Sequence, residues 1–163
     1  MIKFLIRLFS KGKLKIVEPS EEIKNSYFEK SKSNLISSKI LLENNRLEEA
    51  VALTYYSMYN LVLALLFKIG INQVGLKECE NHSATAILLK EIFGLENSVL
   101  IKAKKERIDK QYYTDFSITK KEVEEGIISA ENFNRDLRGF ISGLSNQKIN
   151  DYKNKFEELL RNE

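Results

Sequence analysis

The feature that most constrains the fold is a run of eighteen consecutive uncharged residues, 50–67, in a chain of which 30% is charged. On a helix, the apolar and aromatic side chains of this run follow two seams that lie roughly 200° apart. The first seam contains Val51, Tyr55, Met58, Val62, Leu65 and Ile69. The second contains Leu53, Tyr56, Asn60, Leu63 and Phe67. A helix that is apolar on both faces is either a membrane span or the central helix of a bundle.

Polar groups inside the run favour the bundle. Thr54, Ser57 and Asn60, together with three tyrosine hydroxyl groups, make the first half of the run too polar for the hydrocarbon of a lipid bilayer. With eighteen residues the run is also near the lower limit for a membrane span, which needs about 17 to 25 residues. The sequence therefore predicts a buried central helix, and a membrane partner is disfavoured.

Length and composition fit one compact domain. The chain has 163 residues with one proline and seven glycines, so few irregular connections are expected. The single cysteine, Cys79, cannot form an internal disulfide bond, and the single histidine, His82, belongs to no cluster of metal ligands. We expect a cytoplasmic protein that uses no metal and no cofactor.

The net charge of +3 is concentrated at the N-terminus. Residues 1–17 contain no acidic side chain and five basic ones: Lys3, Arg7, Lys11, Lys13 and Lys15. The rest of the chain has 21 basic and 23 acidic residues, so its net charge is −2. Binding of a nucleic acid therefore has to depend on a local basic patch rather than on the overall charge.

The same N-terminal segment is amphipathic, since Ile2, Leu5, Ile6 and Phe9 share one face of a helix. Arg7 interrupts the apolar run and no small-residue cleavage site follows, so a secretory signal is not expected. The segment can pack on its own bundle, bind a partner, or lie on an anionic membrane surface. We favour packing or partner binding over the membrane.

Start and stop signals divide the chain into helices, with no strand expected. Ser20 is a suitable N-cap, Gly70 a suitable helix end, and Thr119 with Glu122 forms a capping box. The expected helices are 20–44, 47–69, 81–93, 95–113, 119–144 and 147–161, and the longest loop is 71–80. His82 then lies at a helix start, where the helix dipole lowers the pKa of an imidazole.

Apolar seams predict how these helices pack. In the first long helix Ser31 and Ser38 alternate with large residues along the seam and leave room for a close neighbour. The seam of helix 119–144 has a 3.5-residue repeat that a single polar residue, Asn134, interrupts. The sequence predicts an all-α, up-and-down antiparallel bundle of four to five long helices plus a C-terminal amphipathic helix. We divide it into an N-terminal extension (1–19), the bundle (20–144) and the C-terminal helix (145–163).

Three stretches carry a family resemblance. They are the run 50–66, the helix start 81–83, and Arg107 followed by Asp109, Tyr112 and Tyr113. Together they resemble the small HEPN proteins of bacteria and archaea (higher eukaryote and prokaryote nucleotide-binding) over about residues 24–140. The resemblance implies a helical bundle, often homodimeric and often encoded beside a minimal nucleotidyltransferase. It also implies the RNA-binding or RNA-cleaving half of a toxin–antitoxin or defence system.

Nuclease members of that family use an arginine followed, after four to six residues, by a histidine. In this chain Arg107 is followed after four residues by Tyr112 instead. Cleavage through the ribose 2′-hydroxyl needs a base that titrates near neutral pH, which histidine does and tyrosine does not. Low-ranking catalytic candidates are therefore Arg107, Tyr112 and His82. An active metal-independent ribonuclease with a variant site and a purely protein-binding adaptor both remain alternatives.

A basic, tyrosine-containing segment is the best candidate surface for RNA or a nucleotide. The predicted contact residues are Lys102, Lys104, Lys105, Arg107, Lys110 and Tyr113. Cations suit phosphates and aromatic rings suit bases, although a charged helix is more often simply a solvated face. Arg107 shares a stripe with apolar residues, so a buried pair with Glu106, Asp109 or an acid of another helix is equally expected. A capping or buried hydrogen-bonded role is favoured for His82, unless the fold places it beside Arg107.

The tyrosines of the central helix need partners for their hydroxyl groups. Tyr55, Tyr56 and Tyr59 lie on successive faces, so they cannot all point into the core. Ser57 and Asn60 are the expected partners. Core packing is the simpler interpretation, and a pocket between helices is the functional one.

Overall fold

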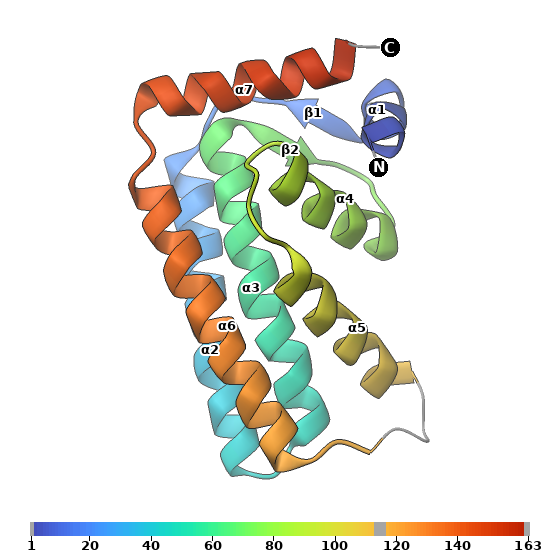
Figure 1. The fold of residues 1–163 in the computed structure, drawn as a ribbon, viewed down its shortest axis with the longest axis vertical. Coiled ribbons are helices and arrows are strands. Elements are labelled where there is room, and N and C mark those ends of the chain that lie inside the picture. The colour runs from blue at the N-terminus through green and yellow to red at the C-terminus, as the bar shows by residue number, and fades with distance from the viewer. Residues whose placement is uncertain (1, 113–116, 162–163) are drawn as a thin grey trace.

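The structure is a computed structural model that describes residues 2–112 and 117–161, without the side chains of residues 110–112. The described residues form seven helices and one two-stranded sheet (Figure 1). The long helices are α2 (Glu21–Glu43), α3 (Leu47–Ile69) and α6 (Lys120–Ser142). The shorter helices are α1 (Ile2–Ser10), α4 (Glu78–Glu91), α5 (Ser98–Tyr112) and α7 (Asn146–Arg161). The strands are β1 (Leu14–Ile16) and β2 (Ile71–Gln73).

Helix α3 is the central helix that the uncharged run predicts. Every residue of its first seam is at most 7% exposed, whereas the second seam is only half-buried. By length and composition α3 could cross a membrane, but 72% of its most apolar window is buried inside the molecule. This burial is what the core helix of a bundle shows.

The long helices α2 and α6 pack against α3 and complete the predicted all-α bundle (Figure 1). Ser31 and Ser38 of α2 are both 0% exposed, which confirms the close approach that these small side chains permit. The α6 seam is buried as well, and its polar member Asn134 donates from Nδ2 to Ser57 Oγ at 3.2 Å. The capping box of Thr119 and Glu122 at the start of α6 is also confirmed.

The expectation of no strands is wrong. Strand β1 pairs antiparallel with β2, with Leu14 opposite Gln73 and Ile16 opposite Ile71. Strands of three residues are too short to show an alternating pattern in the sequence. The sheet forms because Gly70 ends α3 with a φ of 82°, after which the chain turns back along the segment near Val17.

Replacing Gly70 by alanine should destabilise the fold strongly. Its φ is in the left-handed region, and an added Cβ atom would overlap the backbone oxygen of Val17. A Gly12→Ala control has a similar φ of 66° but open space around the Cβ position. Urea unfolding should show that Gly70→Ala lowers the free energy of unfolding by roughly 1 to 3 kcal/mol more than Gly12→Ala. Equal losses in the two variants would contradict the close contact.

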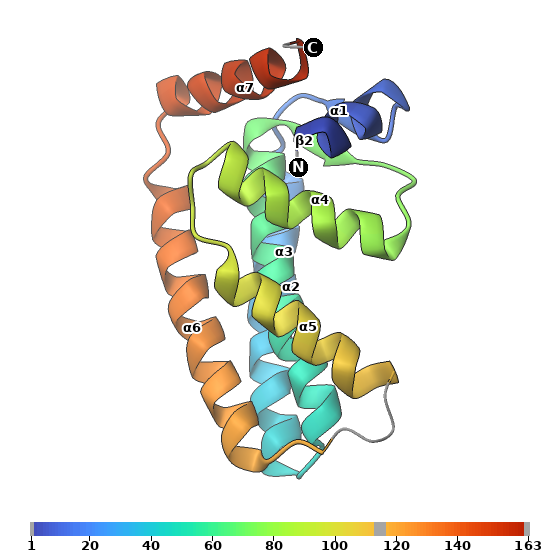
Figure 2. The same ribbon diagram turned by 45° about the vertical axis from the view of Figure 1, so that its right-hand side comes forward.

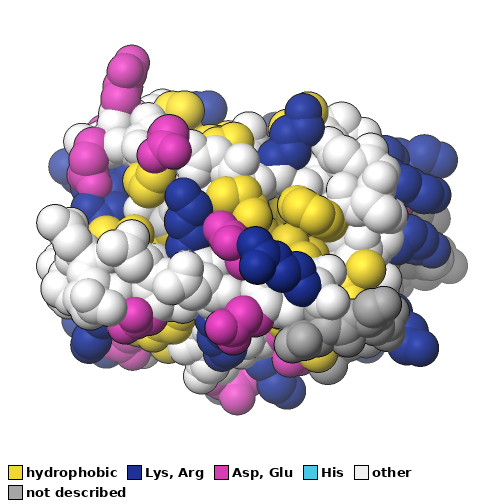
Figure 3. All heavy atoms as spheres, turned by 90° about the horizontal axis from the view of Figure 1, so that it is seen from above, with side chains coloured by type: hydrophobic (Ala, Val, Ile, Leu, Met, Phe, Trp, Pro, Cys, Tyr) yellow, Lys and Arg dark blue, Asp and Glu magenta, His cyan; other side chains and the backbone are white. Residues whose placement is uncertain are grey.

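Helix α7 crosses one end of the bundle and packs against α1, burying Ile149 and Phe156 (Figure 1). Packing of the N-terminal segment on its own bundle is therefore observed, but with a different face from the predicted one. Leu5 and Leu8 are buried, whereas Ile2 and Phe9 are 41% and 39% exposed. The reason is that α1 contacts α4 and β1 as well as α7. Seen from this end, apolar side chains gather near the middle of the face, among basic and acidic ones (Figure 3).

Helices α4 and α5 cross α3 obliquely on the side away from α2 (Figure 2). Helix α4 begins at Glu78, three residues before the predicted start, because Glu80 accepts a hydrogen bond from the backbone N–H of Lys77. His82 is therefore in the second turn and not at the helix start. Helix α5 begins at Ser98 instead of at residue 95, because Glu96 Oε1 accepts from the backbone N–H of Ser98 at 2.8 Å. On this side of α3 the two helices meet, and Lys104 of α5 donates to Ser83 of α4.

Candidate functional site

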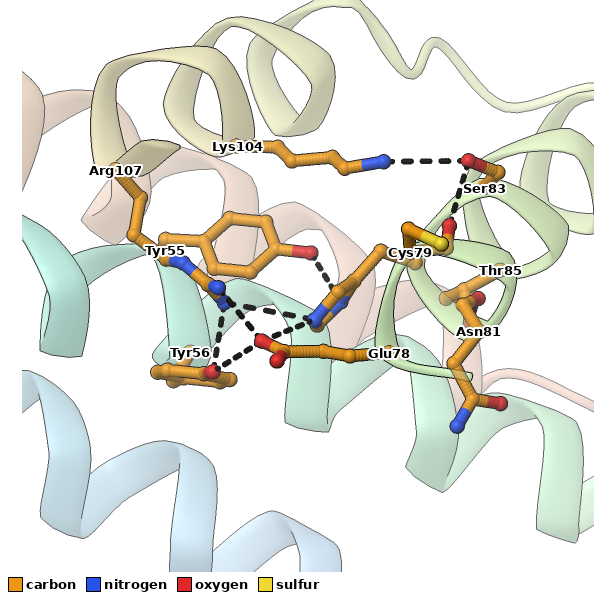
Figure 4. A network of polar contacts seen from close by, with 10 residues as sticks. Tyr55, Tyr56, Glu78, Cys79, Asn81, Ser83, Thr85, Lys104 and Arg107 are labelled. Carbon is orange, nitrogen blue, oxygen red and sulfur yellow. Dashed lines mark hydrogen bonds and ion pairs between the residues drawn. The ribbon is translucent and has the colours of Figure 1, made fainter. Parts of the chain in front are cut away.

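Arg107 on α5 is the buried cation of the molecule's polar centre. Its side chain is only 5% exposed and points towards α3 and α4 (Figure 4). Nη2 donates to Glu78 Oε1 at 2.6 Å, and Nη1 donates to the hydroxyl oxygen of Tyr56 at 2.6 Å. The guanidinium also lies 5.0 Å from the ring centroid of Tyr56. The prediction that Arg107 pairs with an acid of another helix is confirmed, because a buried guanidinium needs such a partner.

His82 lies beside this arginine, although the two residues are 25 positions apart in the chain. Its Nε2 atom is 3.5 Å from Arg107 Nη1 and 3.4 Å from Glu78 Oε1. Its Nδ1 atom is 2.6 Å from the hydroxyl of Tyr55. Burial lowers the pKa of His82, and the neighbouring carboxylate of Glu78 acts in the opposite direction. The ring is therefore neutral at pH 7.

The tyrosines keep their protons, which determines what the histidine can do. Burial raises the pKa of Tyr55 far above its usual value and that of Tyr59 to about 12. We assign the proton of the neutral ring to Nε2, because Nε2 faces Glu78 Oε1 and a carboxylate oxygen can only accept; the Tyr55 hydroxyl then donates to Nδ1. That N–H faces the oxygen of Glu78. His82 is thus a hydrogen-bond donor towards the Arg107 side of the site.

Glu78 joins the network. Its Oε1 atom accepts from Arg107, from the Tyr56 hydroxyl at 3.2 Å and from His82 (Figure 4). The hydrogen bond from Arg107 is the main reason why the pKa of Glu78 falls to about 2. The Glu78 side chain is nevertheless 58% exposed, whereas Arg107 and His82 are each 5% exposed. The carboxylate therefore lies at the mouth of the site, over buried donors.

Three donors from three helices converge on one negatively charged oxygen. Arg107 comes from α5, His82 from α4 and Tyr56 from α3. A guanidinium with two neutral donors beside it is the arrangement that binds a phosphate oxygen, and here the chain's own carboxylate has that place. We call these three residues together the anion site. Among the described residues, no group of three or more histidine, cysteine or acidic side chains could hold a metal ion.

Hydroxyl partners of the tyrosines differ from the predicted ones. Tyr55 and Tyr56 bond to residues of α4 and α5, and not to Ser57 or Asn60. Ser57 instead donates to the backbone oxygen of Thr54 at 2.8 Å. A side chain within one turn on the same helix cannot reach outward to a ring that points at a neighbouring helix.

The predicted RNA surface is divided between two faces of α5. Lys104 points towards α4, where Nζ donates to Ser83 Oγ at 3.2 Å, and burial lowers its pKa (Figure 4). Lys105 is exposed. Lys102 faces α6 instead, where it lines a pocket of about 550 Å³ that is rimmed by Glu106, Asp109, Glu122 and Glu125. Tyr113 and the side chains of Lys110 and Tyr112 lie outside the described residues.

Sequence reasoning missed Glu78 and the role of Tyr56. One signal for Glu78 was available, since a glutamate four residues before a histidine shares its helical face. Residue 78 falls within the expected loop 71–80, where helical spacing carries no information. Tyr56 could not be singled out, because three neighbouring positions are all tyrosine. They differ only in their contacts with residues of α4 and α5, which the sequence does not show.

The titration of His82 tests this network directly, because a chain with one histidine gives one imidazole signal in NMR spectra. We expect His82 to titrate below 6.5 in the wild type, and lower still in Glu78→Gln, since the carboxylate favours the imidazolium. Glu91→Gln, the same charge change at the far end of α4, should leave it unchanged. The depressed pKa adds stability that is present above pH 6.5 and is lost as the pH falls below it. A wild-type value at or above 6.5 would contradict the burial of the ring.

Comparison with known proteins places the chain in a family. A model of the HEPN domain matches residues 25–139, which covers most of the chain and includes all of the residues in the network. A search of the curated proteins found no match.

Proposed function

The chain belongs to the HEPN-domain family, and we propose that it binds single-stranded RNA by placing a phosphate of the backbone in the anion site of Arg107, His82 and Tyr56. The observation that carries the proposal is the convergence of these donors on Glu78 Oε1. A carboxylate oxygen and a phosphate oxygen make the same hydrogen bonds to a guanidinium. The phosphate replaces Glu78, whose exposed side chain can turn out into water.

Neighbouring residues favour a polynucleotide over a free anion. Lys104 and Lys105 stand on α5 within one turn of Arg107 and provide cations for further phosphates. Tyr56 brings its aromatic ring to the site itself, and the ring of Tyr59, which is buried, lies behind it with the two centroids 6.4 Å apart. Cations beside aromatic side chains form the usual surface for unpaired nucleotides.

We extend the proposal to the setting in which the protein acts. On the family resemblance, it works as a homodimeric partner or effector in a nucleotidyltransferase-linked, toxin–antitoxin-like module in the cytoplasm. Mass measurement in solution tests the homodimer, for which a value near twice 18.9 kDa is expected. Co-purification with the product of a neighbouring nucleotidyltransferase gene tests the module.

A salt series tests the RNA-binding proposal. Fluorescence anisotropy should show binding of a labelled single-stranded RNA that weakens with salt, with a log–log slope of about −0.7 for each phosphate contacted. In Lys104→Gln/Lys105→Gln the slope should become shallower by about 1.4, while Arg135→Gln/Lys148→Gln, on exposed parts of α6 and α7, should leave it unchanged. No binding by the wild type would reject the proposal in favour of a protein-binding adaptor.

The 3.5 Å approach of His82 to Arg107 favours one second function, metal-independent cleavage of RNA. It requires the tautomer of His82 that carries the proton on Nδ1, donated to the Tyr55 hydroxyl, so that Nε2 is free once a phosphate has displaced Glu78. Nε2 then accepts the proton of the ribose 2′-hydroxyl as the 2′-oxygen attacks phosphorus, Arg107 stabilises the phosphorane, and the 5′-oxygen leaves with a proton from the imidazolium or from water. The test is cleavage of RNA in EDTA that is lost in His82→Ala and in RNA with 2′-deoxy sugars. If His82→Ala cleaves as well as the wild type while Tyr112→Phe does not, the base is the tyrosine of the sequence motif instead.

A further inference from the structure

A second cavity lies beside the anion site, on the α2 side of the same helices. It has a volume of about 330 Å³, at the lower end of the range for small-molecule sites, about 300 to 1,000 Å³. Its walls come from α2, α3, β2 and the start of α4. Tyr59 lines it, and the Tyr59 ring is only 4.4 Å from the His82 ring, centroid to centroid. The cavity, which we call the amide pocket, is therefore one aromatic ring away from the anion site.

Carboxamides give the amide pocket its chemistry. Asn60, Asn72 and Asn81 all line it, and Oδ1 of Asn81 is buried without any hydrogen-bond partner among the described residues. In Figure 4, Asn81 points away from Ser83 and Lys104. A buried amide oxygen without a partner costs stability unless a ligand or water satisfies it. Since a carboxamide has an acceptor oxygen and a donor NH₂ group, the pocket suits a solute that offers both hydrogen-bond donors and acceptors.

The other walls of the pocket suit a flat aromatic solute. Tyr27 stacks on Phe67 with an interplanar angle of 16°, and these two rings line the pocket with Leu63 and Ile71. Lys30 is exposed at the rim, its Nζ atom 5.1 Å from the Tyr27 ring centroid. In contrast to the larger pocket between α5 and α6, this one is lined by no acidic side chain of the described part of the chain.

We propose that the amide pocket receives one unpaired nucleobase, with adenine as its best complement, from an RNA whose phosphate occupies the anion site. A carboxamide pairs with the N6 donor and the N7 acceptor of adenine at once. Unpaired uracil also offers an adjacent donor and acceptor, N3–H and O4, so the preference for adenine rests on its larger ring, which covers more of the aromatic walls. Extrusion of single bases into pockets of aromatic and amide side chains is how proteins read single-stranded RNA. This inference rests on the proposed RNA binding and adds the base that is selected.

Abasic RNA separates the two proposals. The probes are labelled oligoadenylate, oligouridylate, and an oligomer of the same length with abasic ribose-phosphate units. We expect oligoadenylate to bind about tenfold more tightly than the abasic oligomer, and more tightly than oligouridylate. Asn60→Ala/Asn81→Ala should bind oligoadenylate only as weakly as the abasic oligomer, whose affinity it should not change. Asn150→Ala/Asn154→Ala, two exposed asparagines of α7, is the matched control and should behave as the wild type.

Each outcome decides between the proposals. Equal affinity for oligoadenylate and the abasic oligomer, or an equal loss for both in Asn60→Ala/Asn81→Ala, would overturn the base pocket and leave phosphate binding standing. Equal affinity for oligoadenylate and oligouridylate would overturn the adenine assignment. Failure of all three oligomers to bind would overturn RNA binding and the pocket together. Thermal unfolding of the variant within about 2 °C of the wild type assures that a loss of binding is local.

Discussion

Replacing Glu78 by glutamine should raise the affinity of the protein for single-stranded RNA by about tenfold. The carboxylate is held by a charge-assisted hydrogen bond from Arg107, a kind of bond worth roughly 1.5 to 3 kcal/mol. We take the lower end because the Glu78 side chain is 58% exposed, so water screens the pair. A neutral glutamine holds Arg107 less tightly and is displaced more easily by a phosphate.

The matched control for this gain is Glu91→Gln. It removes the same charge from the same helix but lies away from the network, so it reports the general effect of a less acidic protein. Because the pKa of Glu78 is about 2, the carboxylate is ionised in the wild type at the neutral pH at which the affinities are compared. Equal affinities of Glu78→Gln and Glu91→Gln would show that the carboxylate does not compete with RNA.

Replacing Arg107 by glutamine should weaken RNA binding by about 100-fold. The variant loses the only cation among the three donors of the anion site, and with it the paired hydrogen bonds that a guanidinium makes to phosphate. Arg107→Lys keeps the positive charge but loses the planar pair of N–H donors of the guanidinium, so we expect an intermediate loss of RNA affinity of about tenfold. Fluorescence anisotropy at a single salt concentration measures all three proteins.

Two further variants make the Arg107 result interpretable. Arg135→Gln removes an exposed arginine of α6 and should cost little affinity. The double variant Glu78→Gln/Arg107→Gln should bind as weakly as Arg107→Gln alone, since there is no cation left for the carboxylate to block. Tenfold tighter binding by the double variant would mean that Glu78 acts on the RNA by simple repulsion and not through Arg107.

Strong periodic signals predicted the bundle, and weak local ones did not predict its details. The two seams of residues 50–67 and the 3.5-residue repeat of residues 123–141 fix which faces meet, so α3 and α6 were placed almost to the residue. The sheet between Leu14–Ile16 and Ile71–Gln73 joins segments that are distant in the chain. The sheet forms because the chain reverses direction after Gly70 and pairs with residues 14–16. No local sequence pattern predicts this pairing.

The candidate site was predictable only in part, for a related reason. Arg107 and His82 could be named one by one, since a stripe of apolar residues around an arginine and a single histidine are visible in the sequence. Their contact depends on how α4 and α5 cross α3, which is a property of tertiary packing. Lys102 is an example of the opposite error. It is only three residues from Lys105 in the sequence and was predicted to share a surface with it, but it faces the acidic pocket beside α6.

The most direct test of the account is the NMR signal of His82 during a titration with single-stranded RNA. Because His82 is the only histidine and contacts Glu78 within the anion site, its imidazole signal reports what occupies that site. The account predicts a saturable shift whose midpoint equals the dissociation constant from anisotropy, and no such shift in Arg107→Gln. An unchanged His82 signal at RNA concentrations where the protein is fully bound would contradict it, since the RNA would then lie elsewhere on the molecule.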